Sequence, residues 1–180
     1  MCMEVVVPEE FKYLYVQSDE RPIVKVPNPV LRQKAPEIQR VSKKTQLLID
    51  DMLRIMRKAN GIGLAAPQIG ILQRLVVVAP EGMKPTALIN PRVTKSEGEV
   101  VLEEGCLSIP GLYGNVSRPA AIEVEALDRK GRKLTLRLQG MKSRVVQHEI
   151  DHLDGILFID KVDATTLHWT NPETVAGKAE

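Results

Sequence analysis

Gln147-His148-Glu149-Ile150-Asp151-His152 is the stretch of this sequence that says most about its fold and its chemistry. Its apolar spacing predicts a helix over 141–153. Residues four apart share one face of a helix, so the imidazoles of His148 and His152 can reach the same metal ion. Glu149 follows the first histidine directly, which places its carboxylate beside such an ion rather than on it. A carboxylate there can exchange protons with water at the ion.

A third ligand is needed, because a catalytic metal site generally has three protein ligands and one open position. On its own, the histidine spacing also fits an ordinary amphipathic helix with core or solvated histidines. Cys106, within Glu103-Glu104-Gly105-Cys106-Leu107-Ser108, follows an expected strand, and its thiolate would complete a Cys-His-His set. The commonest fate of a single internal cysteine is a buried free thiol. Because His148 and His152 already supply two ligands, the role of metal ligand is favoured for Cys106.

A glycine-containing segment, Gly61-Ile62-Gly63-Leu64-Ala65-Ala66-Pro67-Gln68, is the other unusual stretch. Two glycines two positions apart let the backbone approach a ligand closely or adopt positive φ. The segment then offers unpaired peptide groups to an extended peptide, as an added strand would. It lacks the third glycine and the lysine of phosphate-binding loops. It is equally consistent with a tight turn between a helix and a strand.

The remaining pattern predicts an α+β fold, with antiparallel strands packed around one central helix. Apolar residues recur at three and four positions from Lys44 to Asn60, which predicts a helix with Ser42 as its N-cap. Short β-branched segments predict strands at 75–79, 86–90, 98–102, 122–127 and 133–138. Asp128 to Gly131 is suited to the turn between the last two strands. Gly111 to Gly114 is expected in a loop after Cys106.

Length and composition agree with one globular domain. The chain has 180 residues, of which 43% are hydrophobic and 27% charged, with a net charge of +2. That charge does not indicate direct binding to nucleic acid. No apolar run is long enough to cross a membrane, and the first residues do not form a secretory signal. The two cysteines, Cys2 and Cys106, make a poor disulfide framework, so the reducing cytoplasm is the expected compartment.

Three of these segments, in this order, resemble the signature motifs of the peptide deformylases: Gly61–Gln68, Glu104–Ser108 and Gln147–His152. The resemblance extends from about Pro22 to Asp160. It implies a single catalytic domain over 1–180, with an N-terminal arm at 1–20, a family-like core at 22–160 and a polar tail at 161–180. The implied reaction is hydrolysis of the N-formyl group of the initiator methionine of nascent polypeptides, with release of formate.

The resemblance also implies a role for individual residues. Cys106, His148 and His152 would bind one divalent ion; iron(II) is favoured by the family, while zinc, nickel and cobalt suit the same ligands. Glu149 would be the general acid/base. Gln68 and the backbone N–H of Leu107 would stabilise the oxyanion. The expected substrate contacts are Gly61, Ile62, Gly63, Glu104 and Tyr113, although Tyr113 is equally consistent with an ordinary surface tyrosine.

Residues 161–180 differ from the common bacterial pattern, in which a long basic helix is associated with ribosome docking. Two lysines there face three acidic residues, and Pro172 interrupts any helix. Docking to the ribosome, if it occurs, is therefore not expected through such a helix. His168 in this tail is expected at the surface.

Two alternatives remain open. A zinc endopeptidase shares the His-Glu-x-x-His pattern and would take a downstream ligand from His168, Glu173 or Glu180. A non-catalytic module with a structural metal would need a fourth ligand from Cys2 or His168.

Overall fold

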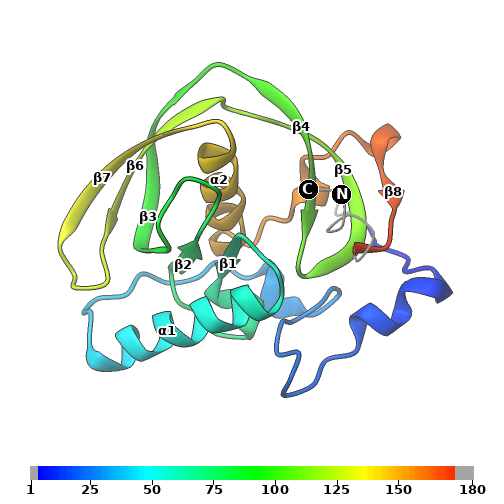
Figure 1. Ribbon diagram of the computed structural model, residues 1–180, viewed down its shortest axis with the longest axis horizontal. Coiled ribbons are helices and arrows are strands. Elements are labelled where there is room, and N and C mark those ends of the chain that lie inside the picture. The colour runs from blue at the N-terminus through cyan, green and yellow to red at the C-terminus, as the bar shows by residue number, and fades with distance from the viewer. Residues whose placement is uncertain (1–3, 173–180) are drawn as a thin grey trace.

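The computed structural model describes residues 4–172. The chain folds as two antiparallel sheets with one long helix between them (Figure 1), which confirms the α+β expectation. The helices are α1 (Lys43–Lys58) and α2 (Met141–Leu153), and α2 has the predicted bounds. Short 3-10 helices connect the larger elements: η1 (Glu9–Tyr15), η2 (Pro29–Arg32), η3 (Ala66–Ile69), η4 (Phe158–Asp160) and η5 (Ala164–Thr166).

The two sheets contain eight strands between them. The five-stranded sheet has the order β1-β2-β3-β6-β7, formed by β1 (Gly63–Ala65), β2 (Leu75–Val78), β3 (Thr86–Glu97), β6 (Ala121–Leu127) and β7 (Lys133–Gln139). The three-stranded sheet has the order β4-β5-β8, formed by β4 (Val100–Cys106), β5 (Ile109–Arg118) and β8 (His168–Trp169). Strands β3 and β4, joined only by Gly98 and Glu99, together arch over α2 from one sheet to the other (Figure 1).

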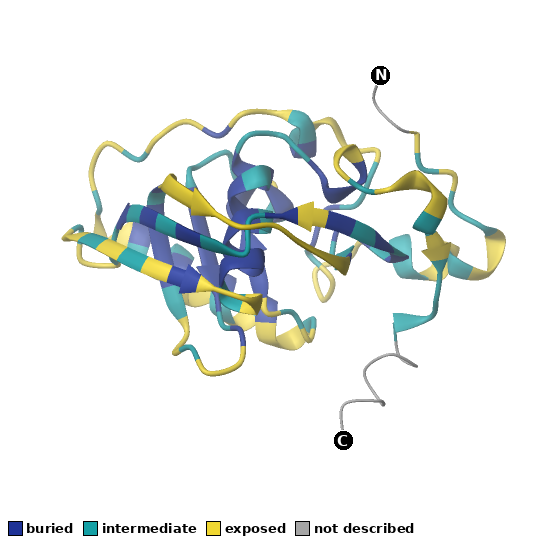
Figure 2. Cartoon of the chain, turned by 90° about the horizontal axis from the view of Figure 1, so that it is seen from above, coloured by how far each residue is buried: buried dark blue, intermediate teal, exposed yellow. Residues whose placement is uncertain are grey.

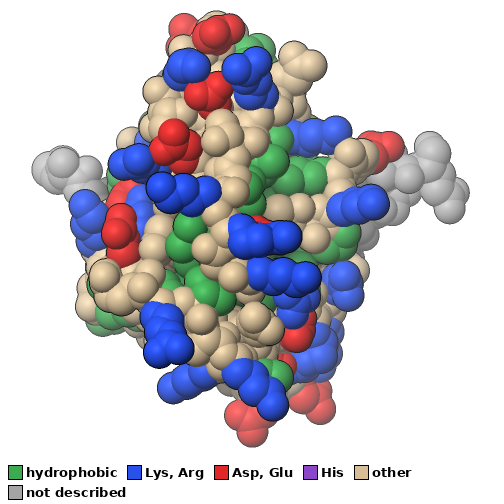
Figure 3. All heavy atoms as spheres, turned by 90° about the vertical axis from the view of Figure 1, so that its left-hand side faces the viewer, with side chains coloured by type: hydrophobic (Ala, Val, Ile, Leu, Met, Phe, Trp, Pro, Cys, Tyr) green, Lys and Arg blue, Asp and Glu red, His purple; other side chains and the backbone are tan. Residues whose placement is uncertain are grey.

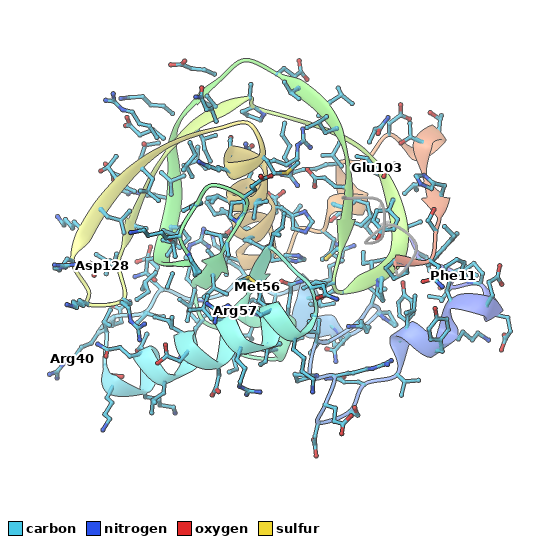
Figure 4. All side chains as sticks on the ribbon, in the orientation of Figure 1. Phe11, Arg40, Met56, Arg57, Glu103 and Asp128 are labelled. Carbon is cyan, nitrogen blue, oxygen red and sulfur yellow. The ribbon has the colours of Figure 1, made fainter. Side chains whose placement is uncertain are left out.

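Helix α1 begins where the sequence predicts. The Ser42 side chain accepts a hydrogen bond from the Thr45 N–H, and the Thr45 hydroxyl accepts one from the Ser42 N–H, which forms a capping box. The buried face presents Ile49, Met52 and Met56 to the five-stranded sheet, and Figure 4 shows Met56 on that side of the helix.

The core consists of three apolar clusters, and their boundaries matter for the site. Helix α2 packs through Val145, Val146, Ile150 and Leu153 against β2, β3, β6 and β7. Helix α1 packs on another cluster around β1 and β2. The third cluster lies under the three-stranded sheet and includes Ile109, Val116 and Phe158, with Cys106 at its margin. Figure 2 shows buried residues concentrated around α2 and exposed ones on the outer hairpins. The two ligand-bearing elements, α2 and β4, therefore border different clusters.

The β6–β7 hairpin confirms the predicted turn. Leu127 pairs with Lys133, and the Asp128 carboxylate accepts from the N–H groups of Lys130 and Arg132. Figure 4 shows Asp128 at the tip of this hairpin. Basic and acidic side chains are interspersed on this side of the molecule (Figure 3), where Arg129 and Arg132 form ion pairs with Asp50 and Asp128.

Several boundaries predicted from sequence were wrong. Gly98 lies in the β3–β4 turn with a φ of 67°, so the strand expected at 98–102 begins at Val100 and continues to Cys106. The segment Gly111–Gly114, expected in a loop, lies within β5, where β4 pairs with Tyr113 and Gly114 and β8 pairs with Leu112 and Tyr113. Strands β1, β5 and β8 were not predicted.

The described part of the tail also packs against the fold. Its strand β8 pairs with β5, and Val162, Leu167 and Trp169 contact the third apolar cluster. From the other end of the chain, Phe11 of η1 reaches the same place, with its ring centroid 5.1 Å from that of Trp169. Residues 173–180, which contribute to the predicted tail charge, lie outside the described range. Within residues 4–172, no helix is long and apolar enough to cross a membrane.

Candidate metal and active site

The predicted ligands converge at the centre of the molecule. His148 and His152 come from α2, and Cys106 is the last residue of β4. One ligand atom from each of the three lies within 4.8 Å of the others. The Sγ atom of Cys106 is 3.3 Å from Nε2 of His152. Thiolate and imidazole donors at these separations fit a divalent transition-metal ion with open coordination positions.

The orientation of both histidines also fits a bound metal. Nδ1 of His148 is hydrogen-bonded to Oε2 of Glu104 at 2.9 Å, which leaves Nε2 for the centre. A carboxylate on the distal nitrogen is the usual support of a metal-bound histidine. His152 directs Nε2 at Cys106, while its Nδ1 is buried without a partner among the described residues. Burial lowers the pKa of His152, which keeps it in the neutral form that a metal requires.

Glu104 is buried at the centre of a network of hydrogen bonds. Its carboxylate is buried and accepts from Arg118, Arg144 and His148, and a carboxylate has about four acceptor positions. Four hydrogen bonds from these three residues use that capacity, and one of them supports His148. The substrate contact expected of Glu104 stays a prediction. Burial alone would raise the pKa of Glu104, but the hydrogen bonds from Arg118 and His148 lower it far below its usual value.

Glu149 lies beside the ligands without joining them. Its side chain is buried, and its Oε2 atom has no hydrogen-bond partner among the described residues. Burial raises the pKa of Glu149 to about 7, against the opposing charges of His148 and Arg118. A buried, unpartnered carboxyl with that pKa is suited to accept and return a proton.

Gln68 is also buried and points at the centre. Its Oε1 accepts from the Ala65 N–H at 2.9 Å, which fixes the amide orientation. Its Nε2 then lies 3.2 Å from Oγ of Ser108 and 3.6 Å from Sγ of Cys106. The side chain is thus a donor aimed at the space next to the ligand set.

A cavity of about 860 Å³ opens onto this centre. The residues expected to contact substrate all line it, as does Leu107: Gly61, Ile62, Gly63, Glu104 and Tyr113. Strand β1 lies at the edge of one sheet and β4 at the edge of the other, and residues of both line the cavity. Gly61 and Gly63 do not have positive φ; a side chain at either would collide with Leu107 or Glu149, so close approach is what requires glycine there.

Of the side chains that the rival interpretations offered as further ligands, the structure describes His168, and it lies outside the ligand set. His168 is exposed, stacks on Tyr113 and lies 3.5 Å from Glu103, a residue of β4 labelled in Figure 4. Cys2, Glu173 and Glu180 lie outside the described residues.

Sequence reasoning missed two arginines that support the site. Arg144 is one helical turn before His148, so its place on the ligand face of α2 was a usable signal. Arg118 reaches the site from β5, and no local pattern indicates it.

Comparison with known proteins agrees with this geometry. Residues 20–167 match the family model described as polypeptide deformylase. A peptide deformylase of Halothermothrix orenii is 49% identical over 141 residues, covering 78% of this chain and 92% of that protein. The crystal structure of the Thermus thermophilus peptide deformylase has a TM-score of 0.77 at 46% identity, covering 80% of this chain and 86% of that one. That of the Synechococcus elongatus enzyme in complex with actinonin has a TM-score of 0.77 at 41% identity, covering 79% and 80%.

Proposed function

The chain belongs to the polypeptide deformylase family, and from this premise we propose the role of each residue at its centre. It is a hydrolase of protein biosynthesis that removes the formyl group from nascent formylated polypeptides, and it binds a divalent metal through a Cys-His-His site. We propose that Cys106, His148 and His152 are the ligands and that the ion in the cell is iron(II).

The proposed chemistry needs a strong nucleophile at neutral pH, because a formamide is a stable amide. A bound divalent ion lowers the pKa of water from 15.7 to about 7 and polarises a carbonyl group. Glu149 accepts the proton of the attacking water at Oε2, its unpartnered oxygen. It then delivers that proton to the α-amine as the C–N bond breaks, which converts water and the formyl-peptide into formate and a free N-terminus.

Two donors stabilise the negative charge that develops on the formyl oxygen. We assign this role to Nε2 of Gln68 and the backbone N–H of Leu107. Gln68 is held in place by Ala65, so its donor is oriented before substrate arrives. Donors that are fixed in advance lower the barrier more than donors that must reorient.

The substrate peptide is proposed to lie between the β1 and β4 edges, where its backbone pairs as an added strand. Ile62, Met141 and Val145 offer apolar surface in the cavity for the methionine side chain. Such substrates are made in the cytoplasm, or in an organelle if the source is eukaryotic, and we propose that compartment. Any ribosome contact would use a surface other than a long basic C-terminal helix.

The convergence of three ligands beside the unpartnered Glu149 carboxyl is the observation that most supports this proposal. The test is formate release from formyl-Met peptides by metal-loaded protein, with mass spectrometry of the peptide product. We expect formate and an intact peptide with a free amine. Cleavage at internal bonds would instead indicate an endopeptidase.

Metal content tests the ligand assignment separately. Replacing Cys106, His148 or His152 with Ala should abolish metal binding and activity together. Stoichiometric metal at the same place in all three variants would overturn the assignment.

A further inference from the structure

Arg144 is a buried charge that the proposed reaction does not use. Its side chain is 6% exposed. From α2 it donates to Oε1 of Glu104 at 2.6 Å, to the Val116 carbonyl at 3.0 Å and to the Val100 carbonyl at 2.6 Å. Burying a guanidinium is costly unless it is fully paired, so its presence here calls for an explanation.

The partners of Arg144 all belong to the opposite sheet. Val100 and Glu104 lie on β4, the strand that ends at Cys106, and Val116 lies on β5. The apolar face of α2 packs instead on the five-stranded sheet, whereas β5 and Cys106 border the third cluster. A stacking contact between His148 and Phe158 is an apolar link between the two sides.

Hydrogen bonds between buried polar groups also connect α2 to the three-stranded sheet. Arg118 of β5 binds Glu104 and also Asp151 of α2, at 2.8 Å for the latter. Glu104 binds His148, and Arg144 closes the network from the helix back to the strand. Unlike apolar contacts, these hydrogen bonds are directional and fix one register between helix and strand.

We propose that Arg144 is a positioning residue that holds the Cys106 strand in register with the His148–His152 helix, so that the metal site is preformed. Without Arg144, β4 would lose its attachment to α2 at Val100, and Glu104 would keep only His148 as its partner on that helix. Metal binding would then have to bring the thiolate and the two imidazoles together, and the free energy spent on ordering them would lower the metal affinity. Changes in groups that support metal ligands typically weaken metal binding by about 10- to 100-fold.

The experiment measures zinc affinity, by chelator competition, in wild type, Arg144→Met and Arg74→Met. Methionine replaces the unbranched stem of the side chain and removes every donor. Arg74 is a matched control: its side chain is 12% exposed and, from the position just before β2, it donates at 2.8 Å to Asp154, the C-cap residue of α2, outside the metal site. We expect zinc binding to weaken about 10- to 100-fold in Arg144→Met and by less than about threefold in Arg74→Met. The visible spectrum of the cobalt form should change only in the former.

Two outcomes would overturn the inference. One is wild-type zinc affinity in folded Arg144→Met. The other is equal loss of affinity in both variants at equal loss of melting temperature, which would indicate general destabilisation. If Arg144→Met does not fold, Arg144→Lys decides, because one ammonium cannot reach all three acceptors: weakened zinc binding supports the proposal and wild-type affinity refutes it. This inference rests on the proposed metal site, and zinc retained by Cys106→Ala would refute that site instead.

Discussion

The carboxyl group of Glu149 fills the space that a side chain on Gly63 would need. A Cβ atom built on Gly63 would lie 2.8 Å from Cδ of Glu149 and still closer to its Oε1. The backbone of β1 therefore passes directly against the proposed general base. Two parts of the chain that are far apart in sequence are fitted to each other at this point, and the fit explains the glycine better than a turn does.

Gly63→Ala should displace Glu149 without touching a metal ligand. We expect the metal content to stay at wild-type level while kcat falls by about 10-fold or more, since small misplacements of a reacting group are costly. Metal analysis beside steady-state kinetics checks this. Unchanged kcat in Gly63→Ala would show that Glu149 tolerates the shift.

Glu149→Gln should keep the fold and the metal while losing most of the turnover. The amide has nearly the same shape but cannot accept the proton from water, and general acid–base catalysis contributes about 10²- to 10⁴-fold. Turnover per bound metal is the quantity to measure. A rate close to that of wild type would exclude the general-base role.

Gln68→Ala should lower kcat by about 10²- to 10³-fold with little change in KM, as loss of an oxyanion donor does elsewhere. Gln68→Glu should be worse, because its carboxylate would face the developing negative charge. The Gln68 amide also bonds Ala65 and Ser108, so a bracing role is a real alternative. Bracing would appear as a lower melting temperature or a higher KM with chemistry nearly intact.

Glu104→Gln separates support of His148 from substrate contact. The neutral amide cannot accept from two arginines and His148 as the carboxylate does, so two buried guanidinium groups lose their counter-charge. We expect a lower melting temperature and weaker metal binding, by about 10- to 100-fold, with KM almost unchanged for the metal-loaded fraction. A raised KM with normal metal affinity would restore the substrate-binding expectation.

Local patterns predicted the helices and the histidine pair well, because those depend on neighbours within one or two turns. Ser42 caps α1 as expected, and α2 has the predicted bounds. Strand β5 was not predicted from the sequence, because Pro110, Gly111 and Gly114 are residues typical of loops. Gly114 is there because an added Cβ would lie 2.6 Å from Val162, a residue of the chain's later segment. That reason is tertiary and is invisible in a local window.

In the candidate site, too, local patterns predicted some features, whereas others depend on tertiary structure. The residues that would touch metal and substrate were named from motif spacing and from a resemblance. The charge network around Glu104 was not predicted, since its arginine partners come from β5 and from an earlier turn of α2. Charge networks that span two sheets depend on topology, so spacing along the chain does not reveal them.

The contact between Phe11 and Trp169 has a consequence for the integrity of the protein. Both rings lie outside residues 20–167, the part that matches the family, and both cover strand β5. Trimming by a protease to that shared core would remove the two rings at once and would free the edge of β5 that β8 occupies. An uncovered edge beside apolar surface is a template for pairing between molecules. The segments that carry Phe11 and Trp169 thus cover an edge that would otherwise be open to pairing with another molecule.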